Sequence, residues 1–136
     1  MNQLSRSNGL KIAAVIVLLL GLIGMVVYDI PDLARGMDAV NQAANANQGP
    51  PYFVAVIGFA VDVLAVVAAY GVWRAERWGV ILAIIISAIN SLNGAGAAIF
   101  APQVSTRIVG TIGIILSLGV IYLCLRREPK PLTTSV

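Results

Sequence analysis

The stretch YFVAVIGFAVDVLAVVAAYGVW, residues 52–73, holds a single charged side chain, Asp62. A transmembrane helix needs about 20 mostly apolar residues, so this stretch predicts a membrane span. Three further stretches of the same kind lie at residues 10–28, 79–100 and 108–125. We therefore expect an all-α, polytopic membrane protein whose four transmembrane helices form an antiparallel bundle, within a single membrane domain covering residues 1–136.

The composition excludes most soluble classes. Of the 136 residues, 59% are apolar and 11% are charged, whereas soluble domains are about half apolar and about a quarter charged. The chain has no histidine, and Cys124 is its one cysteine. Histidine-based metal, haem and acid–base sites and intrachain disulfides are thereby excluded. We expect no cofactor, no metal and no enzymatic activity.

The basic residues predict the orientation of the spans. Seven precede or open the first span, lie between the second and third, or follow the fourth: Arg6, Lys11, Arg74, Arg77, Arg126, Arg127 and Lys130. The opposite side has only Arg35 and Arg107. Basic residues favour the cytoplasm, so both termini are predicted inside the cell, with the protein in the inner or plasma membrane and residues 126–136 a disordered tail. This bias accounts for the net charge of +3 without a nucleic-acid partner.

Two tryptophans and two arginines surround the turn between the second and third spans. Trp73 and Trp78 are predicted at headgroup depth, with Arg74 and Arg77 in the phosphate layer. Such residues are typical interfacial anchors in the lipid bilayer. A binding site at this turn is the other interpretation.

The segment between the first two spans, residues 29–51, is the one sizeable outer loop. Asp29 can cap a helix and Pro31 suits its first turn. Apolar residues recur at helical spacing along the loop, at Leu33, Met37, Val40 and Ala44. This pattern predicts a short amphipathic helix on the extracytoplasmic face, which either closes the bundle or serves as a docking element or lid.

A polar cluster is predicted at the membrane midplane. Asp62 lies ten residues after Tyr52, about 15 Å into the bilayer. Asn90 and Ser117 fall at the same depth in the third and fourth spans, and Ser87 and Ser91 share a helix face with Asn90. Glycines on the spans, among them Gly21, Gly24, Gly58, Gly94 and Gly110, predict close helix contacts.

Two roles for Asp62 remain open. In the structural role it is neutral, or hydrogen-bonded to Asn90 and Ser117, and holds helices together. In the functional role it binds a proton or cation during transport. The spans otherwise show no second acid, no basic residue at depth and no proline-broken helix, which favours the structural role.

The pattern Gly71-Val72-Trp73-Arg74-Ala75-Glu76-Arg77-Trp78-Gly79 resembles the cytoplasmic turn, G-x-W-x-x-x-R-W-G, of small uncharacterised bacterial four-helix membrane proteins. The resemblance covers the turn and the layout, and it implies no functional residue. We expect a non-enzymatic structural or accessory protein that acts by helix–helix association, as a homo-oligomer or within a larger membrane complex. The alternative is a small oligomeric transporter, coupled to protons or cations through Asp62.

Overall fold

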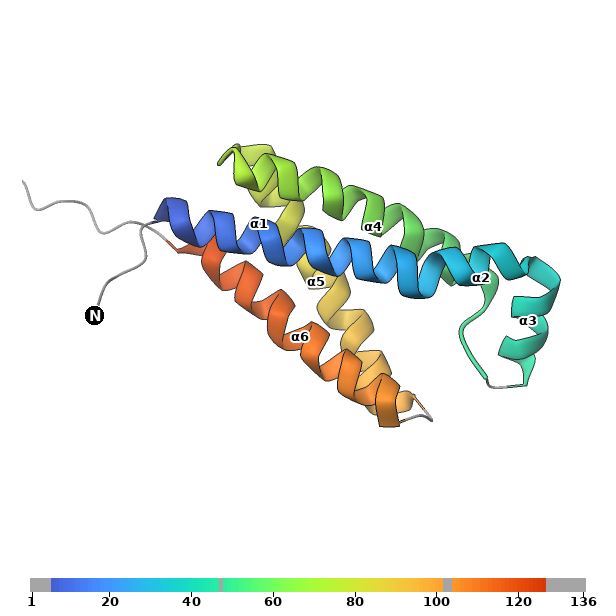
Figure 1. Ribbon diagram of the computed structural model, residues 1–136. Helices are drawn as coiled ribbons and strands as arrows, with labels where there is room; N and C mark the ends of the chain where they lie inside the picture. Colours follow the sequence, from blue (N-terminus) through green and yellow to red (C-terminus); the bar gives the residue numbers. More distant parts are fainter. Residues whose placement is uncertain (1–5, 47, 102–103, 127–136) are drawn as a thin grey trace, which may run out of the picture.

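The computed structural model describes residues 6–46, 48–101 and 104–126, and every regular element within them is a helix (Figure 1). In chain order these are α1 (Arg6–Ile23), the π-helix η1 (Gly24–Asp29), α2 (Ile30–Arg35), α3 (Met37–Asn45), α4 (Tyr52–Trp73), α5 (Arg77–Phe100) and α6 (Val104–Leu125). The tail predicted at residues 126–136 lies outside the described residues, apart from Arg126.

Four helices are long and apolar enough to cross a membrane, which confirms the predicted all-α class and the number of spans. The second coincides with the predicted residues 52–73, and the last two begin a few residues earlier than predicted. The first differs most, because α1, η1 and α2 form one helical run, Arg6–Arg35, of 30 residues. Residues 29–35, predicted as the beginning of the outer loop, are helical and continue this run without a break.

Pro31 gives a physical reason for the π-helical turn within this run. Proline has no N–H, and its ring clashes with the carbonyl four residues earlier, here Val27. A π turn, with hydrogen bonds from residue i+5 to residue i, widens the helix and accommodates such a defect. Accordingly, the Ile30 N–H donates to the carbonyl of Met25. The sequence favoured Asp29 as a helix cap, but its side chain makes no capping hydrogen bond.

The rest of the loop folds as the separate helix α3. Gly36 has a φ of 85°, which interrupts the helix between α2 and α3. Val40 on α3 is buried, whereas Met37 is exposed, so only part of the predicted apolar stripe faces the protein. Asn41 accepts a hydrogen bond from the Tyr52 N–H at 3.0 Å. This bond ties α3 to the first turn of α4, where a backbone donor would otherwise lack a partner.

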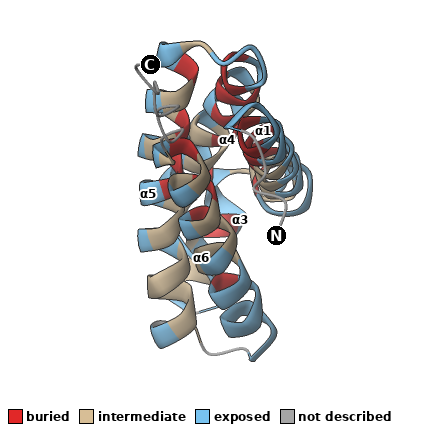
Figure 2. Ribbon diagram, turned by 90° about the vertical axis from the view of Figure 1, so that its left-hand side faces the viewer, coloured by how far each residue is buried: buried red, intermediate tan, exposed pale blue. Residues whose placement is uncertain are grey.

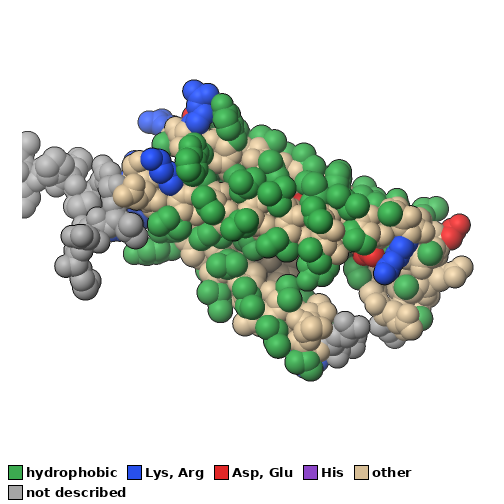
Figure 3. All heavy atoms as spheres, in the orientation of Figure 1, with side chains coloured by type: hydrophobic (Ala, Val, Ile, Leu, Met, Phe, Trp, Pro, Cys, Tyr) green, Lys and Arg blue, Asp and Glu red, His purple; other side chains and the backbone are tan. Residues whose placement is uncertain are grey.

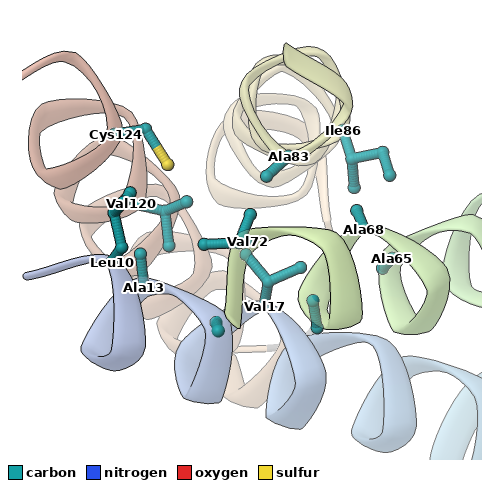
Figure 4. Packing of buried hydrophobic residues seen from close by; sticks show 12 residues of the cluster. Leu10, Ala13, Val17, Ala65, Ala68, Val72, Ala83, Ile86, Val120 and Cys124 are labelled. Carbon is teal, nitrogen blue, oxygen red and sulfur yellow. The ribbon is translucent and has the colours of Figure 1, made fainter. Parts of the chain in front are cut away.

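The long helices contact one another in a ring, in which α1 packs against α4 and α6, and α5 also packs against α4 and α6. Most buried apolar residues lie at one end of this ring, which we call the closed end (residues 6–20, 65–86 and 117–126) (Figure 2). Val17, Val72, Ile86 and Val120 interdigitate there between alanines (Figure 4). Toward the open end (residues 24–62 and 90–113), α5 and α6 diverge from α1 and α4 (Figure 1).

The turn from α4 to α5 is a Schellman motif. The Ala75 N–H donates to the Val72 carbonyl and the Glu76 N–H to the Gly71 carbonyl, each at 2.9 Å. Ala75 stands at the left-handed position, with a φ of 55°, where glycine is the usual residue. This motif reverses the chain within three residues and brings α5 directly against α4.

Candidate functional site

Asp62, the acid predicted at the midplane, is buried in the contact between α4 and the first helical run. Its residue is 8% exposed. α4 positions the side chain because Gly58, Asp62, Ala65 and Ala69 recur along one face of this helix, and Ala65 and Ala69 are also buried. Gly21 brings α1 close to this face: a Cβ at Gly21 would lie 3.0 Å from the Asp62 carbonyl oxygen.

The partner of Asp62 is Asp29, which the sequence placed in the outer loop. Asp29 is 9% exposed, and its carboxyl group lies beside that of Asp62, close enough for a side-chain hydrogen bond when one of the two is protonated. We call these two residues the carboxyl pair. The sequence showed no second acid within its predicted spans; Asp29 lies one residue beyond the predicted end of the first span, in a helical run, Arg6–Arg35, that continues past Tyr28.

Each carboxyl group of the pair sits over a glycine of the opposite helix. The Asp62 carboxyl occupies the space that a Cβ at Gly24 would need. In the same way, Asp29 Oδ1 lies 2.7 Å from the position of a Cβ at Gly58. The arrangement is reciprocal, since each helix contributes one glycine and one aspartate. Any larger side chain at Gly24 or Gly58 would displace a carboxyl group.

The π turn brings Gly24 and Asp29 to one face of the first helical run. Asp29 lies five residues after Gly24. In a regular α-helix five residues correspond to a rotation of about 140° beyond one full turn, so Asp29 would point away from α4 if Gly24 faced it. In a π-helix the hydrogen-bonded repeat spans five residues, so residues five apart lie nearly above one another. On α4 the matching residues, Gly58 and Asp62, are four apart, which is the α-helical repeat. The π turn of Gly24–Asp29 is thus what aligns the two glycine–aspartate sets.

No basic side chain neutralises the carboxyl pair within the described residues. The two ion pairs there are Asp32–Arg35, at 3.5 Å, and Glu76–Arg74, at 3.1 Å. Asp29 Oδ2 is buried and has no hydrogen-bond partner among the described residues. A hydrogen bond between two carboxyl groups requires a proton on one of them, and two adjacent carboxylates in a buried site repel each other strongly. The arrangement can therefore hold a proton.

The other predicted midplane residues do not join this site. In the described part of the chain no hydrogen bond links Asp62 to Asn90 or Ser117, so the predicted hydrogen bonds are absent there. Ser87 and Ser117 are fully buried between helices, at 2% and 0% exposure. The hydroxyl groups of Ser117 and Ser91 are buried, and neither has a hydrogen-bond partner in the described ranges. Asn90 is half-buried on α5.

The predicted anchor residues form a network at the closed end. Arg74 donates a hydrogen bond to the Tyr70 hydroxyl at 2.9 Å and pairs with Glu76, and Glu76 also accepts from the Trp78 indole. The Tyr70 hydrogen bond raises the pKa of the Arg74 guanidinium above its ordinary value. Lys11 lies over the Trp73 ring, 5.9 Å from its centroid. These exposed polar and aromatic groups are suited to a lipid headgroup layer.

Arg77 begins α5 and is exposed, next to the glycine contact that sets the α4–α5 crossing. A Cβ at Gly71 would lie 2.7 Å from Gly79 Cα, and a Cβ at Gly79 would meet the Gly71 backbone. The two helices touch backbone to backbone at this point. The glycines of the G-x-W-x-x-x-R-W-G pattern therefore have a packing role.

Sequence reasoning missed Asp29, although a signal for it was present. Gly24 and Asp29 repeat the glycine–aspartate order of Gly58 and Asp62 in the next span. Pro31 is typical of the first turn of a helix, but in the structure it follows a π turn inside a longer helical run. A glycine–acid pair in each of two neighbouring spans is the feature that could have identified the site.

Neither a metal centre nor a known relative assigns a role to these residues. Within the described residues no group of three or more acidic, cysteine or histidine side chains could hold a metal ion. Comparison with protein family models, curated proteins and solved structures finds no match for this chain. The resemblance of residues 71–79 to a bacterial four-helix group stays a prediction.

Proposed function

We propose that this chain is a non-enzymatic structural or accessory protein of the inner or plasma membrane that acts by helix–helix association, with a second copy or within a larger complex. One observation carries the proposal: Asn93 on α5 is exposed within a helix long and apolar enough to cross a membrane. An amide without a hydrogen-bond partner is costly in hydrocarbon. A neighbouring helix that supplies a partner would remove that cost.

The position of Asn93 supports this interpretation. Asn93 lies seven residues, about two turns, after Ile86 and therefore on the same face of α5. Ile86 is buried in the core at the closed end. At the open end α4 has diverged from α5, and this face continues as Asn90, Asn93 and Ala97 (Figure 1). Neither asparagine side chain forms a hydrogen bond within the described residues. A helix of another chain, placed between the diverging helices, would cover both.

We propose an antiparallel bundle with both termini in the cytoplasm and α3 on the opposite side of the membrane. The support is the distribution of charge: basic side chains gather at the closed end (Figure 3), whereas Arg35 ends α2, next to α3 in the chain. Labelling of single cysteines tests this orientation. A cysteine at Gln42 should react with an impermeant reagent in intact cells, whereas one at Thr134 should not; the reverse pattern would contradict the topology.

Native mass spectrometry of the protein, extracted from its own membranes with mild detergent or in lipid nanodiscs, tests association. We expect a homo-oligomer or a stoichiometric complex with a larger membrane partner. Asn93→Leu should weaken that complex about fivefold, because an interhelical hydrogen bond in a membrane contributes about 1 kcal/mol. Leu92→Ala, at the adjacent exposed position, is the control and should leave it unchanged. A monomer under both extraction conditions would overturn the proposal.

The second candidate is a small oligomeric transporter coupled to protons or cations through Asp62. It is favoured by a specific observation, namely that Asp29 lies beside Asp62 and neither pairs with a basic side chain among the described residues. In proteoliposomes, Asp62→Asn should abolish uptake driven by a pH gradient while assembly stays intact, and Asp38→Asn on the exposed face of α3 should not. Uptake retained in Asp62→Asn would contradict the transporter.

A further inference from the structure

The environment of Asp29 and Asp62 restricts their charge. Both residues are more than nine-tenths buried, and they lie between two membrane-spanning helices. A fully ionised pair would place two buried negative charges side by side, with no basic side chain paired to them in the part of the chain that the structure describes, which is strongly unfavourable. One proton on the pair halves the charge and supplies the donor that a hydrogen bond between the two adjacent carboxyl groups requires.

The packing holds the two groups in contact. Gly24 and Gly58 leave room for the carboxyl groups, and the π turn aligns Asp29 with the α4 face. If this contact served only to fill space, apolar side chains would serve at lower cost. The remaining Asp29 oxygen, Oδ2, is buried and has no partner among the described residues. That atom is a free acceptor for a second proton.

Asp32 is a further acidic group whose charge acts on Asp29. It lies one turn farther along the helical run, on α2, and its own partner is Arg35, whose side chain is exposed. The acids thus extend from the middle of the span toward the end of the first helical run, in the order Asp62, Asp29, Asp32. Chains of acidic residues of this kind conduct protons in membrane pumps and transporters.

We infer that Asp29 and Asp62 form a proton-binding site, which holds one shared proton at neutral pH and exchanges it at the α2 end of the helix, past Asp32. In the exchange the proton leaves one carboxyl oxygen of the pair and is accepted by the Asp32 carboxylate or by water. Arg35 offsets the charge of Asp32 in the ion pair. The inference does not depend on helix–helix association, since it concerns groups within one chain.

Carboxyl carbon NMR of the full-length protein in lipid nanodiscs, with ¹³C-labelled aspartate, tests the site without any substitution. The chain has four aspartates, Asp29, Asp32, Asp38 and Asp62. At pH 7 we expect the carboxyl signals of Asp29 and Asp62 to show one proton between them. Two ionised carboxylates at positions 29 and 62 would overturn the inference.

Infrared spectroscopy of variants provides the second measurement. The band of a protonated carboxyl group at pH 7 should be present in the wild type and in the control Asp38→Asn, and lost in the double variant Asp29→Asn/Asp62→Asn. In Asp32→Asn the band should remain, with slower exchange for deuterium. A band that persists in the double variant, or exchange unchanged in Asp32→Asn, would count against the site or its route respectively. Proton binding without gradient-driven uptake would separate this site from the transporter.

Discussion

At both ends of the molecule two helices approach closely at glycines, but different side chains fill the space between them. At the closed end, α4 and α5 touch through Gly71 and Gly79, and alanine and valine fill the remaining space. At the open end, α4 meets the first helical run through Gly24 and Gly58, and the space is filled by two carboxyl groups. Small residues thus serve close apolar packing in one place and the accommodation of buried acids in the other.

The difference shows that a glycine on a membrane helix can have either of two roles. Glycine on a membrane helix is commonly a device for close approach, since packing drives association in lipid. Here Gly24 and Gly58 leave a volume that a polar group of the partner helix occupies. The neighbour of the glycine, rather than the glycine itself, decides whether the contact is structural or chemical.

The largest expected effect is at the closed end. Gly79→Val places a branched side chain against the Gly71 backbone, which cannot move away because the turn is only three residues long. We expect a loss of about 3 kcal/mol of unfolding free energy, as for severe overpacking. Unfolding in mixed detergent micelles measures it. Gly96→Val, where a Cβ meets nothing within 4 Å, is the control; equal losses in both variants would contradict the assigned contact.

A smaller effect is expected at the open end. Gly24→Ala should destabilise the protein by about 2 kcal/mol, because the new methyl group displaces the Asp62 carboxyl. A double-mutant cycle with Asp62→Ala sharpens the comparison, since removal of the carboxyl should recover at least half of that loss. Strict additivity of the two substitutions would show that Gly24 and Asp62 do not contact. Gly113→Ala, in open space on α6, should have little effect.

The smallest expected effect is a gain in stability. Ala75→Gly removes the strain of a left-handed residue with a Cβ, and should stabilise the protein by about 1 kcal/mol. The Schellman hydrogen bonds to Val72 and Gly71 remain in the variant, because they involve the backbone. The same unfolding measurement applies. A loss of stability would mean that the flexibility of glycine in the unfolded chain outweighs the strain at this position.

Much of the layout could be predicted because it depends on properties that are local in the sequence. Hydrophobic length predicts a membrane helix, Pro51 marks the beginning of α4, and the charged Arg74 follows its last residue, Trp73. The burial of Asp62 and Ser117 was also predictable, because an apolar span carries few polar residues and they face other helices. Which groups meet these residues was not predictable, since depth in the membrane gives one coordinate and leaves rotation about the helix axis undefined.

The sequence by itself determined that the chain forms four apolar helices, since a backbone in hydrocarbon must satisfy its hydrogen bonds within the helix. Only the tertiary structure decided that Asp29 continues the first helical run and meets Asp62. That pairing depends on the π turn, which changes the rotation about the helix axis between residues 24 and 29. It also depends on the contact between two helices, because Asp29 and Asp62 are 33 residues apart in the chain. Both are relations between helices, and local sequence patterns do not encode them directly.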